Sequence, residues 1–258
     1  MTFKFETAYV SCGCNKVPHA ADWGQNGLIC FGSCNSVIIY DPTVGGEGGK
    51  ILHTLHGHKE RVNSVRWIKS NFQTCEDLFV SASADSTAII WSWSGKHQTC
   101  EQKYCLKGHT NIVNVADGFI RKLNNGTSNP SCIVATSSID SKVMIWETLN
   151  EEVKCVDTIK WASGFCIDIK LTMLPNTDVL LLACSADDNK VHLFGEYKKS
   201  ETDQTDTEQR FYKIHILSGH DDWVRSMDFF CSGIQDLYLA TGSQDTYIRV
   251  YKFEKEMK

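Results

Sequence analysis

GHKERVNSVRW at residues 57–67 and LFVSASADSTAIIW at residues 78–91 are the two stretches that decide the fold of this chain. Apolar residues alternate with polar ones in the first stretch, and in the second a polar turn at Asp85 separates two apolar runs. Short runs of this kind, bounded by turn residues, are typical of β-strands. With a further strand at residues 102–106, the segment predicts a small sheet of four antiparallel strands.

The same pattern occurs five times along the 258 residues. Each copy ends in an aromatic residue, and these residues stand about 50 positions apart, slightly more than the roughly 40–45 residues of a WD40 repeat. Three copies open with Gly-His, and in four an Asp stands six residues before the aromatic. The closing aromatics are Tyr40, Trp91, Trp146, Phe194 and Tyr251; the aspartates are Asp85, Asp140, Asp188 and Asp245, with Cys34 in that place in the first copy. The pattern resembles the WD40 family and predicts an all-β propeller with about five blades of an incomplete ring, which normally has about seven.

We expect a single domain over residues 1–258, with blade cores at about 17–56, 57–106, 107–159, 160–217 and 218–253. Residues 7–12 alternate and are expected to be the orphan outer strand of a closing blade. The polar, acidic stretch 196–210 is expected to be a flexible insertion in the fourth blade. The other strands of a closing blade would come after Lys258, so we expect an open arc with unpaired edges.

The recurring polar residues predict buried structural networks. A His before the blade, a strand Ser or Thr, the turn Asp and the strand-end Trp can form a chain of hydrogen bonds. No nucleophile elbow, phosphate-binding loop or His-Glu-x-x-His motif occurs, so we expect neither catalysis nor a cofactor. The residues expected in these networks are His58, Asp85, Trp91, His109, Asp140, Trp146, Asp188, His220 and Asp245.

Composition narrows the function further. A net charge of −5 argues against autonomous nucleic-acid binding. The longest apolar run, residues 179–184, is far shorter than the roughly 20 residues of a membrane span. The first residues lack the apolar core of a secretion signal, so the twelve cysteines are expected to be thiols in the cytoplasm, with the nucleus as a further compartment. Without a Cys-x-x-Cys pair, no metal site is expected.

Three motifs carry a closer resemblance. GHKERVNSVRW at 57–67, Gly-Phe at 164–165 followed by LPNTDV at 174–179, and GHDDWVR at 219–225 resemble the first part of the second-subunit family of Elongator, whose members are several times longer. The resemblance extends from Thr7 to about Phe253. It implies a non-catalytic scaffold that contacts other Elongator subunits and supports wobble-uridine modification of transfer RNA, with the chemistry in a different subunit. The alternative is another WD40 adaptor, such as a substrate receptor of a ubiquitin ligase.

Overall fold

The computed structural model describes residues 9–11, 13–44, 48–70, 77–122, 130–149, 151–161, 164–197, 209–232 and 236–253. These residues form twenty strands and contain no helix, which confirms the predicted all-β class. A helix that could cross a membrane is therefore not found in this part of the chain.

The strands group into five sheets, which we number as blades 1 to 5 in chain order. Blades 1 to 4 each have four antiparallel strands of their own, and blade 5 has three in the described residues. The strands are β1 (Ala21–Trp23), β2 (Ile29–Ser33), β3 (Ser36–Asp41) and β4 (Lys50–His56) in blade 1; β5 (Val62–Trp67), β7 (Leu78–Ser83), β8 (Thr87–Ser94) and β9 (Thr99–Lys107) in blade 2; β10 (Val113–Arg121), β11 (Ser131–Ser138), β12 (Lys142–Leu149) and β13 (Glu152–Lys160) in blade 3; β14 (Cys166–Met173), β15 (Leu180–Ala186), β16 (Val191–Glu196) and β17 (Phe211–Leu217) in blade 4; and β18 (Val224–Ser232), β19 (Asp236–Ser243) and β20 (Ile248–Phe253) in blade 5.

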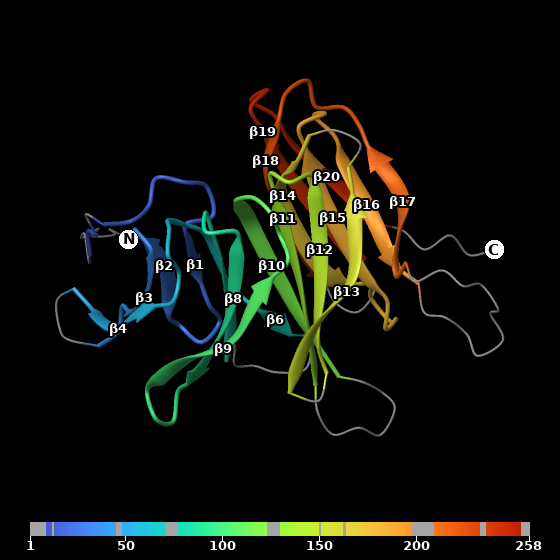
Figure 1. The fold of residues 1–258 in the computed structure, drawn as a ribbon. Helices are drawn as coiled ribbons and strands as arrows, with labels where there is room; N and C mark the ends of the chain where they lie inside the picture. The colour runs from blue at the N-terminus through green and yellow to red at the C-terminus, as the bar shows by residue number, and fades with distance from the viewer. Residues whose placement is uncertain are drawn as a thin grey trace.

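The blades follow one another in chain order along an arc, which begins with blade 1 at the left of Figure 1 and passes through blade 3 to blade 4 at the right, with the red strands of blade 5 behind. The first strand of each of blades 2 to 5 lies at the inner side of its blade, and β5, β10, β14 and β18 contact each other in that order. A short strand, β6 (Lys69–Ser70), leaves blade 2 and pairs in parallel with β10 of blade 3. The sequence did not predict this pairing, because a strand of two residues is too short to show a hydrophobic periodicity.

The core lies between the blades. Four clusters of buried apolar side chains each join two neighbouring sheets. In the cluster between blades 1 and 2, the fully buried Phe79 packs between the rings of Trp67 and Trp91. Burial of one such side chain stabilises the fold by about 1.5–3 kcal/mol. Packing between neighbouring blades therefore stabilises each of them.

Two irregularities recur in the sheets. Near the closing aromatic, the outer strands of blades 1 to 4 each carry one extra residue, and the inner strands of blades 2 to 5 carry another near their start. Such β-bulges bend a strand and redirect its side chains. The extra residues are Leu52, Lys103, Val156 and Ile214 in the outer strands, and Asn63, Asn114, Ile167 and Arg225 in the inner ones.

Two expected segments lie only partly within the described residues. Of residues 7–12, only 9–11 are described, so the expected closing strand stays a prediction; the Tyr9 ring stacks on Tyr40 at 4.4 Å. The expected flexible insertion at 196–210 was wrong at both ends, because Glu196 is the buried last residue of β16 and Arg210 is held by ion pairs. Residues 198–208 of that stretch lie outside the described residues.

Candidate functional site

The predicted residues of blade 2 meet in one hydrogen-bonded chain. The Trp91 indole N–H donates to Ser81 Oγ at 2.8 Å, and His58 Nε2 lies 2.8 Å from the same oxygen. His58 Nδ1 lies 3.1 Å from the Asp85 carboxylate, which also accepts the Lys59 N–H at 2.8 Å. The β8 strand brings Trp91 to the network, and the turn before it places Asp85.

The directions of the pKa shifts indicate the protonation states of His58 and Asp85 in this network. Burial is the largest influence on His58 and lowers its pKa, so the imidazole is neutral near pH 7. Burial opposes the ionisation of Asp85, but hydrogen bonds from Thr87 and the Lys59 N–H hold its pKa below the ordinary value. A neutral His58 then donates from Nδ1 to Asp85 and accepts the Ser81 hydroxyl at Nε2, which satisfies every member.

Ser81, His58 and Asp85 have the connectivity of a Ser-His-Asp catalytic triad. Catalysis requires a nucleophile that a substrate can reach, and Ser81 is fully buried. Its oxygen also accepts the Trp91 N–H, which occupies one of its lone pairs. The arrangement therefore supports a structural role, and the same geometry recurs in other blades with Thr in place of Ser.

Blade 3 repeats the chain closely. Trp146 Nε1 donates to Thr136 Oγ1 at 2.9 Å, and His109 Nε2 lies 2.8 Å from that hydroxyl. His109 Nδ1 lies 3.0 Å from Asp140. Burial opposes ionisation of Asp140, but the Thr110 N–H and His109 lower its pKa overall.

Blade 5 has a shorter chain. His220 lies 2.7 Å from Asp245 and 2.9 Å from Thr241 Oγ1. Tyr251 replaces the tryptophan, so no indole N–H joins the network. Partial burial opposes ionisation of Asp245, but hydrogen bonds from the Tyr247 N–H and His220 hold its pKa far below the ordinary value.

Blade 4 uses a different partner. Asp188 binds His192 Nε2 at 2.9 Å, and His192 lies on β16 of the same blade rather than in a Gly-His loop. The Asp188 side chain is 42% exposed, whereas the Asp85 side chain is 8% exposed. Burial is the largest influence on His192 and lowers its pKa. Blade 4 thus keeps the turn aspartate without the buried chain.

Three aspartates that the sequence reading missed connect neighbouring blades. Asp22 of blade 1 accepts the Trp67 N–H of blade 2 at 2.8 Å. Asp117 of blade 3 accepts the Leu171 N–H of blade 4 at 2.8 Å, and Asp168 of blade 4 accepts the Met227 N–H of blade 5 at 2.8 Å. The sequence signal that could have identified them is an Asp within an inner strand that is mostly apolar. Burying such a carboxylate costs free energy unless it accepts hydrogen bonds.

Polar side chains also meet at the inner side of the arc. His19 Nε2 of blade 1 lies 3.5 Å from Asp168 of blade 4, and Lys69 of blade 2 lies 3.2 Å from Asp228 of blade 5. Burial, together with the charges of Arg66 and Lys170, lowers the pKa of His19 to about 3. His19 is therefore neutral near pH 7.

Blades 3 and 4 share a buried ionic cluster, which we call the Arg–Glu clamp and which consists of Arg121, Glu147, Glu196 and Arg210. Arg121 binds Glu196 at 2.7 Å and Glu147 at 3.0 Å. Arg210 Nε donates to Glu196 at 2.8 Å, and its Nη1 also binds Glu147. Burial opposes ionisation of Glu147, but hydrogen bonds from Arg210 and Ser131 hold its pKa below the ordinary value. The two positive and two negative charges balance.

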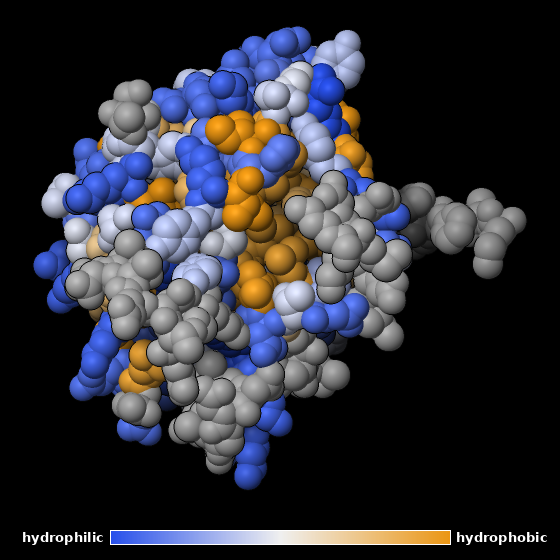
Figure 2. Space-filling view, turned by 90° about the vertical axis from the view of Figure 1, so that its right-hand side faces the viewer, coloured by the Kyte–Doolittle hydropathy of each residue, from blue (hydrophilic) through white to orange (hydrophobic). Residues whose placement is uncertain are grey.

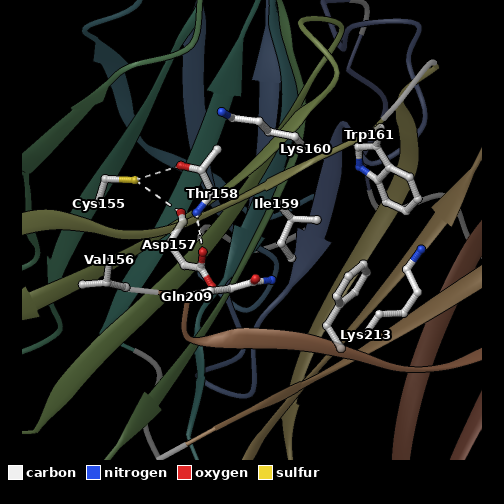
Figure 3. A pocket seen from close by; sticks show the side chains of 10 residues that line it. Cys155, Val156, Asp157, Thr158, Ile159, Lys160, Trp161, Gln209 and Lys213 are labelled. Atoms are coloured by element: carbon white, nitrogen blue, oxygen red, sulfur yellow. Dashed lines mark hydrogen bonds between the residues drawn. The ribbon is translucent and has the colours of Figure 1, made fainter. Parts of the chain in front are cut away.

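A groove of about 680 Å³ lies beside this clamp, between the outer parts of blades 3 and 4 (Figure 3). Its apolar floor contains Ile159 and Phe194, which are 7% and 3% exposed. Trp161 lies along one side with the Lys213 side chain next to its ring, and Asp157 and Gln209 lie at the other side (Figure 3). The remaining lining residues are Cys155, Val156, Thr158 and Lys160.

A bulge in β13 lies at the groove. Ile145 pairs with Asp157 and Trp146 pairs with Cys155, so Val156 is the extra residue. The bend brings Asp157 against blade 4, where its carboxylate accepts the N–H groups of Arg210 at 2.9 Å and Phe211 at 2.6 Å. Sequence reading did not find this site, because a bulge changes the register without changing the residue pattern.

Within the described residues, no group of three or more His, Cys, Asp or Glu side chains could hold a metal ion. The cysteines of this part of the chain are all unpaired thiols.

Comparison with known proteins agrees with this architecture. The family described as WD domain, G-beta repeat matches residues 49–92 and 211–252. Each matched segment begins in the outer strand of one blade and continues through three strands of the next. The predicted WD40 fold, with an incomplete set of blades, is therefore confirmed.

Full-length relatives give a closer comparison. A Drosophila melanogaster protein named Elongator complex protein 2 is 37% identical over 253 residues, which cover 98% of this chain and 30% of that protein. The proteins of that name from Homo sapiens and Schizosaccharomyces pombe are 33% and 25% identical, each over 96% of this chain. The chain spans 28% to 30% of the length of these relatives.

Proposed function

Since this WD40-repeat chain is a homologue of Elongator complex protein 2, as its motifs indicated, we propose that it is a non-catalytic scaffold of an Elongator-type complex. The observation that carries the proposal is homology along 98% of the chain. In this role the chain contacts other subunits and supports wobble-uridine modification of transfer RNA. We propose that it acts in the cytoplasm, with the nucleus as a further compartment.

The buried networks support a scaffold without chemistry of its own. Ser81 has a triad-like geometry, but it is enclosed and its oxygen is already bonded on both sides. The His58 and His220 rings are likewise bound between a hydroxyl and a carboxylate. Propellers built in this way present their loops and blade edges as rigid binding surfaces.

Affinity purification from the cells that express the chain tests the proposal. We expect a tagged chain to co-purify with the other subunits of Elongator, identified by mass spectrometry. Depletion should lower the level of modified wobble uridine in bulk transfer RNA, measured by liquid chromatography with mass spectrometry. Purification without any Elongator subunit would contradict the proposal, and recovery of a ubiquitin ligase instead would favour the other WD40 adaptor.

A further inference from the structure

The groove between blades 3 and 4 lies between two outer strands. In the described residues, β13 and β17 are each the last strand of their sheet, with one edge unpaired. An unpaired strand edge offers backbone N–H and C=O groups to an incoming extended chain. On the side of the molecule that carries β17, apolar surface is exposed between hydrophilic residues (Figure 2).

The charges at the groove are not balanced. Lys160 and Lys213 are exposed, and neither has an ion pair among the residues that the structure describes. The carboxylate of Asp157 accepts the N–H groups of Thr158, Arg210 and Phe211, and its charge offsets only one of the two lysines. The groove therefore presents a net positive charge beside an apolar floor.

The aromatic side of the groove is already packed. Lys213 Nζ lies 5.6 Å from the centre of the Trp161 ring and 5.7 Å from that of Phe194. The rings of His192 and Phe194 meet Trp161 edge to face, at 4.7 and 6.1 Å between centroids. Among the described residues, the buried Trp161 indole N–H has no acceptor.

From these features we propose that the groove binds an extended protein segment in which acidic residues flank an apolar side chain. The apolar side chain packs on Ile159 and Phe194, and the carboxylates pair with Lys160 and Lys213. A single-stranded nucleic acid fits less well, since base stacking needs an open aromatic face. This inference deepens the proposed scaffold function and rests on it only for the identity of the complex.

Peptide binding to the complete purified chain tests the groove. The probe is a fluorescein-labelled nonapeptide with a central Leu-Phe pair flanked by Asp and Glu. In one control peptide Lys replaces the acidic residues, and in the other Ser-Ser replaces Leu-Phe. We expect the fluorescence anisotropy to show binding of the first peptide and of neither control peptide. The affinity should fall as salt is added, because salt screens exposed charges.

The variant Lys160→Glu with Lys213→Glu should weaken binding of the acidic peptide about tenfold or more, because it places like charges together. The matched control is Lys50→Glu with Lys103→Glu, which reverses two exposed lysines on the outer strands of blades 1 and 2. It should leave the affinity within about twofold of the parent chain, because the exposed charges it changes lie outside the groove. Should the first variant unfold, Lys160→Gln with Lys213→Met removes the charges and keeps the packing on Trp161.

Absence of binding by the acidic peptide would overturn the proposal. The proposal would also be overturned if the groove variants and the Lys50 and Lys103 control lost affinity for the peptide equally. Binding of a single-stranded oligouridylate through Lys160 and Lys213, in place of the peptide, would contradict it as well. The proposed scaffold function fails on a different readout, the absence of Elongator subunits from the affinity purification. A chain that binds the peptide without co-purifying those subunits would support the groove and refute the assignment to Elongator.

Discussion

Replacement of Glu196 by Gln should destabilise the contact between blades 3 and 4. The Glu196 carboxylate accepts two hydrogen bonds from Arg121 Nη1, at 2.7 and 2.9 Å, one from Arg210 Nε at 2.8 Å and one from the Leu180 N–H at 3.3 Å. Its side chain is 1% exposed. Glutamine keeps one oxygen but turns an NH2 group toward these donors and leaves two guanidinium groups with a single carboxylate. Removing one partner of a buried ion pair costs about 3–5 kcal/mol.

A loss of this size is a large part of the roughly 5–15 kcal/mol by which native domains are stable. The matched control is Glu152→Gln, since Glu152 pairs with Lys154 at 3.3 Å while both side chains are more than 60% exposed. An exposed pair contributes only about 0–1 kcal/mol. Arg121→Met in the Glu196→Gln background should cost less than the sum of the two single changes, because it removes one of the two guanidinium groups that would otherwise share Glu147.

Urea unfolding, followed by tryptophan fluorescence, measures the free energy of each variant. Hydrogen exchange then locates the effect, which should appear first in β10, β12 and β16, the strands that carry the clamp. Equal midpoints for Glu196→Gln and Glu152→Gln, with unchanged exchange in these strands, would refute the role assigned to the clamp.

Three further predictions follow from other features. His58→Ala and Asp85→Ala should each cost about 1–3 kcal/mol by leaving a buried partner unsatisfied, and a double-mutant cycle by urea unfolding should be strongly non-additive; simple additivity would contradict the network. Because the pKa of His19 falls from 6.5 to about 3 on folding, the unfolded chain binds its proton more tightly, so stability should fall as the pH drops from about 6.5 toward about 3; His19→Gln, which still offers Arg66 an acceptor, should make the Tm less pH-dependent over that range. Ile248→Lys with Val250→Lys should reduce aggregation in light scattering without lowering the Tm, because both side chains are exposed (77% and 65%) on the edge strand β20; unchanged aggregation would show that this edge is not the cause.

The sequence was sufficient for the parts of the fold that repeat. The turn at Asp85, the strand that ends at Trp91 and the Gly-His before β5 recur at regular spacing, so one blade could be read from another. The partners of His58 followed from the same comparison, because only a few residue types can satisfy a buried imidazole.

The Arg–Glu clamp could not be predicted in this way. Arg121 is 26 residues from Glu147 and 75 from Glu196. Among the described residues no other blade has such a cluster, and charged residues at strand ends usually face water. The groove depends on the bulge at Val156, which shifts the register by one residue and leaves the apolar pattern unchanged. Both features arise from the way two blades pack, which a repeat pattern does not encode.

The contacts across the inner side of the arc have a consequence for synthesis on the ribosome. Lys69 and its partner Asp228 are 159 residues apart. His19 of blade 1 likewise contacts Asp168, which lies three blades later in the chain. At about 5–20 residues per second, roughly 8–30 s pass between translation of Lys69 and of Asp228. During that interval blades 1 and 2 can form, while their inward polar groups still face water. The nascent chain therefore completes these two contacts only after blades 4 and 5 have emerged.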